Sequence, residues 1–288
     1  MMACANSNYY SNNEIVKLLL ENGADPNIKD VDGTTALMIS SKYTSEDSTI
    51  ETVKLLLDNK ADPNLKDNDG WTALMMASRY SNVESSVGTI KLLLKNGADP
   101  NLKDNEEWTA LMKACRHSNK DSNIETVKLL LENGADPNIQ DDKGKTALMK
   151  SCRYANTDSN IETVKLLLNV DNINVNIITN DNKYNALMLL CIYNPNQHET
   201  VKLLKSKTDL SYVNSKNKKI EDICLDEYLY LFSKNLDEFL QNHETIKSEC
   251  FLCTEENIDC VKCEFDHHTC INCLPRVKYN CEACRKSF

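Results

Sequence analysis

Glycine and aromatic residues are scarce in this chain of 288 residues, which contains seven glycines and only 6% Phe, Trp and Tyr. No stretch approaches the roughly 20 consecutive apolar residues that a membrane-spanning helix needs, so we expect no membrane association. Residues 1–13 are polar and rich in Asn, without the charged and apolar regions of a secretory leader. We therefore expect an intracellular protein, with the cytoplasm as its compartment, and not a secreted one.

An excess of basic residues is also absent, because 33 Lys and Arg stand against 43 Asp and Glu, for a net charge of −10. Proteins that bind nucleic acids neutralise phosphates with Lys and Arg. We expect no nucleic-acid partner. Before the C-terminal segment the chain shows no Ser/His/Asp set, phosphate-binding loop or Cys/His pair that would indicate covalent catalysis.

Cysteine, in contrast, is abundant at the C-terminus, where the last 39 residues hold eight of the 13 cysteines. They form the Cys-x-x-Cys pairs Cys250/Cys253, Cys260/Cys263, Cys270/Cys273 and Cys281/Cys284, with His267 and His268 between the second pair and the third. Two such pairs complete one closed tetrahedral zinc site, so the segment predicts two structural Zn²⁺ ions and no hydrolytic centre. A disulfide framework, the alternative, requires an oxidising compartment. So short a segment has too little apolar material for a core, and we expect it to fold on its metal.

A repeat organises the preceding 250 residues. An Ala-Asp-Pro-Asn turn and a Thr-Ala-Leu-Met run both recur every 37 residues, and each unit also carries a leucine-rich stretch that it could not bury alone. The turns begin at Ala24, Ala61, Ala98 and Ala135, and the runs begin at Thr35, Thr72, Thr109 and Thr146. Stacked pairs of antiparallel helices are therefore predicted.

Local signals place the ends of the leucine-rich helices. Ser–Glu capping boxes are predicted at their starts, at Ser11/Glu14, Ser48/Glu51, Ser122/Glu125 and Ser159/Glu162. Glycines that can take the left-handed conformation are predicted to close them, at Gly23, Gly97 and Gly134. Polar residues between the two helices of a unit, such as Ser45-Glu46-Asp47, predict lengthened loops on one face.

These motifs resemble the ankyrin repeat, whose Asp-x-Gly-x-Thr-Pro-Leu-His and Gly-Ala-Asp-x-Asn signatures match residues 69–75 and the Gly-Ala-Asp-Pro-Asn turns. The sequence departs from them in having Ala-Leu-Met for Pro-Leu-His and a period longer than the usual 33 or so. The expected fold is mostly α: an ankyrin-repeat solenoid followed by a small RING-like domain with two zinc ions. We expect about six repeats in residues 1–215 with the first one incomplete, a helical cap and linker in 216–249, and the zinc domain in 250–288.

Two zinc topologies fit the spacing of the C-terminal ligands. Sequential pairing puts Cys250, Cys253, Cys260 and Cys263 on one ion and the last four cysteines on the other. The alternative order of three thiolates, one His and four thiolates resembles the RING finger. The resemblance implies that Cys250, Cys253, Cys270 and Cys273 hold the first zinc and that Cys263, His267, Cys281 and Cys284 hold the second. Cys260 and His268 remain alternative ligands.

Members of the RING family act as ubiquitin ligases without a covalent intermediate, by docking a ubiquitin-charged conjugating enzyme. The resemblance implies that Leu252 and Val277 contact that enzyme and that Arg285 clamps it to ubiquitin. The ankyrin array then selects the protein substrate. Two residues depart from the family pattern, since Val277 replaces Trp and Glu282 replaces Pro. They favour the alternative function, a non-enzymatic interaction scaffold with a structural zinc-binding tail.

The Asn- and Lys-rich repeats are also similar to the ankyrin proteins of giant DNA viruses that infect amoebae. That resemblance implies a host protein as the target and the host cell as the compartment.

Three columns of the repeat invite a functional interpretation. The first column is either a strip that binds a partner or, as we favour, a set of packed rings with solvated cations. It consists of Lys42-Tyr43, Arg79-Tyr80, Arg116-His117, Arg153-Tyr154 and Ile192-Tyr193. The second, Cys4, Cys115, Cys152 and Cys191, alternates with Ser and predicts a small packing site. The third, Trp71 and Trp108, is either part of a recognition surface or a pair that packs together.

Overall fold

The computed structural model describes residues 13–42, 47–81, 84–118, 122–155, 160–194, 198–216, 218–219, 245–248, 258–262 and 268–270. The chain divides into two units, Met1–Asn194 and Pro195–Phe288. The lengthened loops predicted between paired helices fall largely outside the described residues.

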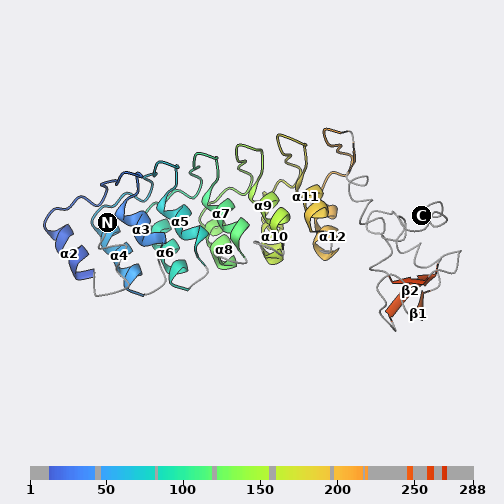
Figure 1. Ribbon diagram of the computed structural model, residues 1–288, viewed down its shortest axis with the longest axis horizontal. Coiled ribbons are helices and arrows are strands. Elements are labelled where there is room, and N and C mark those ends of the chain that lie inside the picture. The colour runs from blue at the N-terminus through green and yellow to red at the C-terminus, as the bar shows by residue number, and fades with distance from the viewer. Residues whose placement is uncertain are drawn as a thin grey trace. The chain divides into compact units, whose positions relative to one another are not determined.

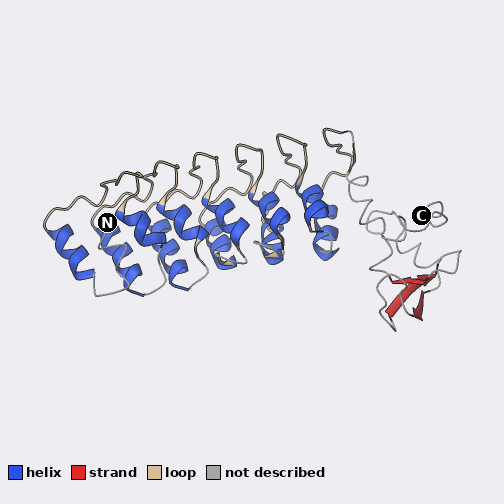
Figure 2. Cartoon of the chain, in the orientation of Figure 1, coloured by secondary structure: helices blue, strands red, loops and turns tan. Residues whose placement is uncertain are grey.

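The first unit consists of helix pairs stacked in two layers, which confirms the predicted helical repeat (Figures 1 and 2). Each helix packs against its counterpart in the next repeat. The Thr-Ala-Leu-Met layer comprises α3 (Ala36–Lys42), α5 (Ala73–Arg79), α7 (Ala110–His117), α9 (Ala147–Tyr154) and α11 (Ala186–Tyr193). The leucine-rich layer comprises α2 (Asn13–Glu21), α4 (Asp47–Asp58), α6 (Glu84–Lys95), α8 (Ile124–Glu132) and α10 (Ile161–Leu168). We call these the first and the second helices.

The Thr-Ala-Leu-Met run starts each first helix. The hydroxyls of Thr72, Thr109 and Thr146 accept a hydrogen bond from the backbone N–H three residues on, as N-cap residues do. The Ala, Leu and Met that follow are buried. The second helices contribute fully buried residues such as Leu93 and Val127, so the core runs along the stack between the two layers.

The predicted Ser–Glu capping boxes are wrong where the structure describes them. Helix α8 is capped by Asn123, whose side chain accepts from the N–H of Glu125, and α10 is capped in the same way by Asn160. The hydroxyl of Ser122 instead lies 2.9 Å from the hydroxyl of Ser81, in the preceding repeat. Asn123 caps the helix because it directly precedes the first helical residue. The buried Ser122 instead forms a hydrogen bond between two repeats. Ser48 lies inside α4, and Ser11 and Ser159 fall outside the described residues.

An asparagine in each Ala-Asp-Pro-Asn turn joins one repeat to the next. The Asn101 side-chain amide donates to the carbonyl of Gly134 at 2.9 Å, and its oxygen accepts from the N–H of Asp136 at 2.8 Å. Three other asparagines bond the following turn in the same way. They are Asn27, Asn64 and Asn138. We call this set the asparagine ladder.

The glycines expected to close the second helices do so, because Gly23, Gly97 and Gly134 have φ angles of +83°, +85° and +84°. Gly70 has a different constraint. It lies in the turn before a first helix, with φ +81°, and a Cβ there would come within 2.7 Å of the backbone N of Asn105 in the next repeat. The absence of a Cβ at Gly70 therefore allows two repeats to approach closely.

Replacing Gly70 by Ala should destabilise the array by about 1–3 kcal/mol more than replacing Gly97 by Ala. Both positions have the same left-handed backbone, but a Cβ at Gly97 would meet no atom within 4 Å. The difference therefore isolates the clash with Asn105. The measurement is urea-induced unfolding followed by circular dichroism. Equal losses in the two variants would show that the repeats can separate at this turn without cost.

The second unit contains α12 (His198–Lys207), an isolated bridge between Val213 and Lys219, and a three-stranded antiparallel sheet. The strands β1 (Thr245–Ser248), β2 (Ile258–Lys262) and β3 (His268–Cys270) are neighbours in that order. Their register sets Cys260 opposite Cys270. Strand β1, which pairs with β2, falls in the range 216–249 assigned to the helical cap and linker. Residues 220–244 of that range lie outside the described residues.

Among the described residues, no helix is long and apolar enough to cross a membrane.

Candidate functional site

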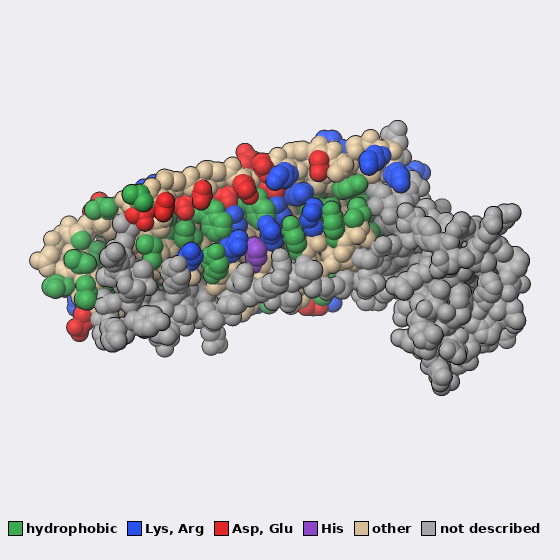
Figure 3. All heavy atoms as spheres, in the orientation of Figure 1, with side chains coloured by type: hydrophobic (Ala, Val, Ile, Leu, Met, Phe, Trp, Pro, Cys, Tyr) green, Lys and Arg blue, Asp and Glu red, His purple; other side chains and the backbone are tan. Residues whose placement is uncertain are grey.

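The first helices have an unusual distribution of charge. The first helices of the first unit are α3, α5, α7, α9 and α11, and they contain no Asp or Glu, although the whole chain has 43 acidic residues. They carry the cations Lys42, Arg79, Lys113, Arg116, Lys150 and Arg153. Figure 3 shows Lys and Arg side chains in a band along this face of the array, with Asp and Glu side chains gathered at the edge formed by the turns.

Two of these cations form buried ion pairs with the turn that precedes their own helix. Lys113 Nζ lies 2.6 Å from Asp104 Oδ2, and their side chains are 6% and 2% exposed. The other carboxylate oxygen of Asp104 accepts from the backbone N–H groups of Glu106 and Trp108. The carboxylate therefore closes the turn with one oxygen and holds the lysine with the other.

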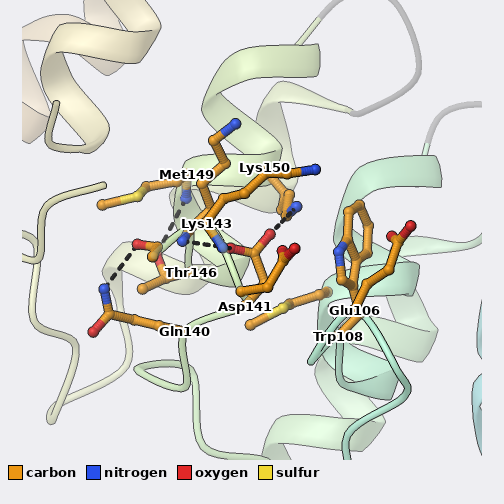
Figure 4. Close-up of polar contacts among 12 residues, drawn as sticks. Glu106, Trp108, Gln140, Asp141, Lys143, Thr146, Met149 and Lys150 are labelled. Carbon is orange, nitrogen blue, oxygen red and sulfur yellow. Dashed lines mark hydrogen bonds and ion pairs between the residues drawn. The ribbon is translucent and has the colours of Figure 1, made fainter. Parts of the chain in front are cut away.

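The next repeat reproduces this arrangement. Lys150 Nζ lies 2.5 Å from Asp141 Oδ2, while Asp141 Oδ1 accepts from the N–H groups of Lys143 and Lys145. Figure 4 shows the pair beside the indole of Trp108, which belongs to the preceding repeat. In the repeat before Asp104, the corresponding carboxylate is Asp67, but Met76 stands at the position of the lysine.

Cations separate the two tryptophans, so they are not a simple stacked pair. Lys113 Nζ lies 3.8 Å from the centre of the Trp71 ring and 4.8 Å from that of Trp108. Lys150 Nζ lies 3.3 Å from the centre of the Trp108 ring. Because an ammonium is attracted to an indole face, the rings help to hold the buried lysines.

The arginine column is ordered by aromatic rings and is not simply solvated. The Arg116 guanidinium lies over Trp108 and over Tyr154, at 5.4 and 4.7 Å from the ring centres. Arg79 lies over Trp71 and Tyr80, and Arg153 lies over Tyr154 and Tyr193. The expectation of freely solvated cations is therefore wrong. The Tyr80 and Tyr154 rings are half-buried and Tyr193 is 46% exposed, and the loops beneath which the rings were expected to pack lie outside the described residues.

A cleft of about 320 Å³ opens between the turn at residues 67–71 and the turn at residues 104–108. It is lined by Asp69, Trp71, Arg79, Asp104, Asn105, Glu106, Trp108, Lys113 and Arg116. The Nε atoms of Arg79 and Arg116 are buried, and no described residue supplies them with a hydrogen-bond acceptor. The cleft thus combines aromatic walls with guanidinium groups that have unused donors.

Burial shifts the pKa values of the ionisable groups in the band. Burial lowers the pKa of Lys113, against the opposing attraction of Asp104. It lowers the pKa of Lys150 to about 8, although the contact with Asp141 raises it. The pKa of Asp67, where no lysine is present, is raised chiefly by burial. The ammonium groups are therefore held in an environment that disfavours their charge.

The cysteine column is a packing site, as its alternation with serine predicts. Cys115 and Cys152 are fully buried, and Cys191 is 3% exposed. Burial raises the pKa of the Cys115 thiol to about 12 and also raises that of Cys152. Their thiolates are correspondingly disfavoured, and Cys4 lies outside the described residues.

The predicted zinc ligands lie mostly outside the described residues. Only the backbones of Cys260, His268 and Cys270 are described, on β2 and β3. The remaining ligands and the predicted contact residues Leu252, Val277 and Arg285 are not described. No group of three or more metal-binding side chains occurs in the part of the chain that the structure describes.

A family comparison agrees with the stacked helix pairs. The model for ankyrin repeats, in three copies, matches residues 1–104 and 118–217. The chain belongs to the ankyrin-repeat family. No curated protein matches it significantly. Ankyrin repeats indicate a role in protein–protein interaction.

Sequence reasoning missed the buried pairs Lys113/Asp104 and Lys150/Asp141. A signal was present, since Lys replaces the apolar residues Met76 and Leu189 of neighbouring repeats at this position. Each Lys lies nine residues after the Asp of its own turn. A lysine in an otherwise apolar column therefore indicates a buried acidic partner.

The Lys150 pair gives the array a distinctive pH dependence. The pKa of Lys150 is about 8 in the folded protein, below its ordinary value of 10.5, so between these two pH values Lys150 binds fewer protons in the folded state than in the unfolded state. The free energy of unfolding should therefore rise with pH across this window. Relative to a Lys150→Met variant, the wild-type protein should gain stability from pH 8 to pH 10, measured by urea unfolding at each pH.

Lys54→Met is the matched control, since Lys54 is exposed on a second helix and has no buried acidic partner. The difference in the free energy of unfolding between Lys54→Met and the wild type should stay constant over the same pH range. If the wild type instead lost stability relative to Lys150→Met, the attraction of Asp141 would outweigh burial, and the direction of the shift would be wrong.

Proposed function

We propose that the chain is a RING-type ubiquitin ligase in which the ankyrin array holds a protein substrate and the C-terminal domain docks a ubiquitin-charged conjugating enzyme. The observation that carries the proposal is the spacing of eight cysteines and two histidines in residues 250–288. It rests on the resemblance to the RING finger, joined to an array whose family acts in protein interaction.

The donor set suits two Zn²⁺ ions, because thiolates and imidazoles are the ligands that structural zinc prefers, and eight donors close two tetrahedra. The proposed ligands are Cys250, Cys253, Cys270 and Cys273 for one ion and Cys263, His267, Cys281 and Cys284 for the other. Cys260 and His268 are the substitutes. The zinc supplies folding energy to this segment and takes no part in a chemical step.

Catalysis in this scheme is positioning. The conjugating enzyme already carries ubiquitin as a thioester, and a substrate lysine attacks it directly. Leu252 and Val277 supply apolar contact to the conjugating enzyme, and Arg285 holds ubiquitin against it. Restricting the thioester to a reactive arrangement beside a bound substrate lowers the entropic part of the barrier.

The proposed setting is the cytoplasm, or the host cytoplasm if the protein is viral. A reducing compartment keeps cysteines available as zinc ligands.

The experiment is discharge of a ubiquitin thioester from a panel of conjugating enzymes onto free lysine, with and without the full chain. Arg285→Ala should abolish most of the acceleration, and Leu252→Ala should weaken it by reducing apolar contact. Elemental analysis should give about two zinc ions per chain in every variant, since neither residue is a proposed ligand.

Lys286→Ala is the matched control, because it removes one positive charge beside Arg285 but outside the clamp position. It should keep wild-type activity. If no conjugating enzyme is accelerated by a wild-type chain with two zinc ions, or if Arg285→Ala matches an active wild type, the ligase proposal fails.

A non-enzymatic scaffold is the second candidate, favoured by Val277 and Glu282, which depart from the family pattern at the docking surface. In that case the zinc segment is a structural tail, and discharge stays at the background rate with every conjugating enzyme.

A further inference from the structure

A line of arginines crosses the central repeats, one from each of three consecutive first helices. Arg79, Arg116 and Arg153 end or nearly end α5, α7 and α9, and these helices are neighbours in the stack. Neither the ankyrin fold nor its turns require arginine here, since the next first helix has Ile192 at this position. We call these three residues the arginine line.

Within the part of the chain that the structure describes, the arginine line has no acidic partner. No carboxylate lies within 4.0 Å of these guanidinium groups among the described residues, whereas Lys113 and Lys150 on the same helices are each paired with a buried Asp. The first helices offer no acidic side chain to neutralise them. The positive charge of the lysines is satisfied internally, and that of the arginines is available to a ligand.

Aromatic rings orient the guanidinium groups before any ligand arrives. Each of the three lies over two rings, at 4.4 to 5.8 Å from the ring centres. A stacked guanidinium keeps its in-plane N–H donors free and loses less entropy when it binds a carboxylate in a fork. Arg79 and Arg116 also line the cleft, although their Nε atoms are buried and meet no acceptor among the described residues.

We propose that the arginine line binds an extended acidic segment of a partner protein, with carboxylates at every third residue. This inference rests on the proposed function in that the segment belongs to the protein that the array captures. Neighbouring packed helices are roughly 8–10 Å apart, which sets the spacing of the arginines. A polyproline II segment advances about 9 Å for each turn of three residues, so side chains at i, i+3 and i+6 project on one side at that spacing.

The acidic residues at the turns set the limits of the binding surface. Asp69 and Glu106 line the same cleft on the turn side, where they would repel a second row of carboxylates. They therefore favour a ligand that presents acidic groups on one side only. This fits a periodic acidic segment better than a polyanion such as a nucleic acid, whose charges surround the molecule.

The test uses the full chain and fluorescein-labelled peptides in fluorescence anisotropy at low salt. One peptide carries Glu at every third residue over three positions within a Pro- and Ala-rich sequence. A second has Gln at the same positions, and a third has the same three Glu residues in adjacent positions. The first should bind at least about tenfold more tightly than either of the others. Its affinity should fall as salt is added.

Protein variants locate the site. The triple variant Arg79→Gln, Arg116→Gln and Arg153→Gln should lower the affinity for the periodic peptide at least about tenfold. The control is a second triple variant, Lys54→Gln, Lys91→Gln and Lys128→Gln, which removes the same charge from the exposed side of the second helices. It should change the affinity for the periodic peptide less than about twofold. Circular dichroism establishes that each variant is folded, and the peptide series tests the proposal without any substitution.

Equal binding of the periodic and the adjacent-Glu peptide would overturn the proposal, as would equal losses in the two triple variants. Tighter binding of an oligonucleotide of the same charge than of the periodic peptide would also overturn it. Peptide binding is measured without conjugating enzyme, so Arg285→Ala should leave it unchanged. Failure of the peptide to bind therefore contradicts the arginine line and leaves the ligase proposal to its own assay.

Discussion

The asparagine ladder is the interaction on which the rest of the array depends, because an Ala-Asp-Pro-Asn turn takes the partners of one carbonyl and one backbone N–H from the preceding repeat. Asn27, Asn64, Asn101 and Asn138 each donate to a carbonyl and accept from a backbone N–H in the following turn. These bonds lie at the exposed edge of the array, where one hydrogen bond contributes about 0.5–1.5 kcal/mol, so the effect of the ladder is the sum over successive turns. The ladder thus fixes the separation and register of successive turns, while the two helical layers bury the apolar faces behind them. Gly70 belongs to the same constraint, since its missing Cβ lets the next turn approach.

The fixed register places equivalent residues of successive repeats side by side, and this produces the charged band. Lys113 and Lys150 can be buried only because the Asp of the preceding turn and a tryptophan from the neighbouring repeat reach them. Arg116 and Arg153 meet the tyrosine of the next repeat in the same way, whereas Arg79 meets Tyr80 of its own repeat. A stack with different spacing would keep the ion pairs, which lie within one repeat, but would remove the tryptophan of the neighbouring repeat from each lysine. The surface that we assign to a partner is therefore a consequence of the turn geometry and not of one repeat alone.

Local chemistry made much of the array predictable, because the period, the closing glycines and the helical character of each unit depend on residues close in sequence. The capping residue was mistaken because Ser122 and Asn123 are both good caps, and the contact between Ser122 and Ser81 in another repeat decides between them. The cation–aromatic band was only partly predictable. The columns are visible in the sequence, but whether Lys113 lies between two tryptophans depends on side-chain directions that periodicity does not encode. The zinc domain and its ligands stay a prediction, carried by the spacing of the cysteines.

Hydrogen exchange of an Asn101→Ala variant tests the central claim most directly. Asn101 bonds Gly134 and Asp136, so its loss should speed amide exchange in the turn at residues 134–138 of the following repeat as well as in its own turn. Asn96→Ala is the control, because the Asn96 side chain donates to the carbonyl of Leu92 in α6, the helix that it follows, and its effect should stay at the end of that helix. Faster exchange confined to residues 96–101 in both variants would contradict the account, since the turns would then be held by their own repeats.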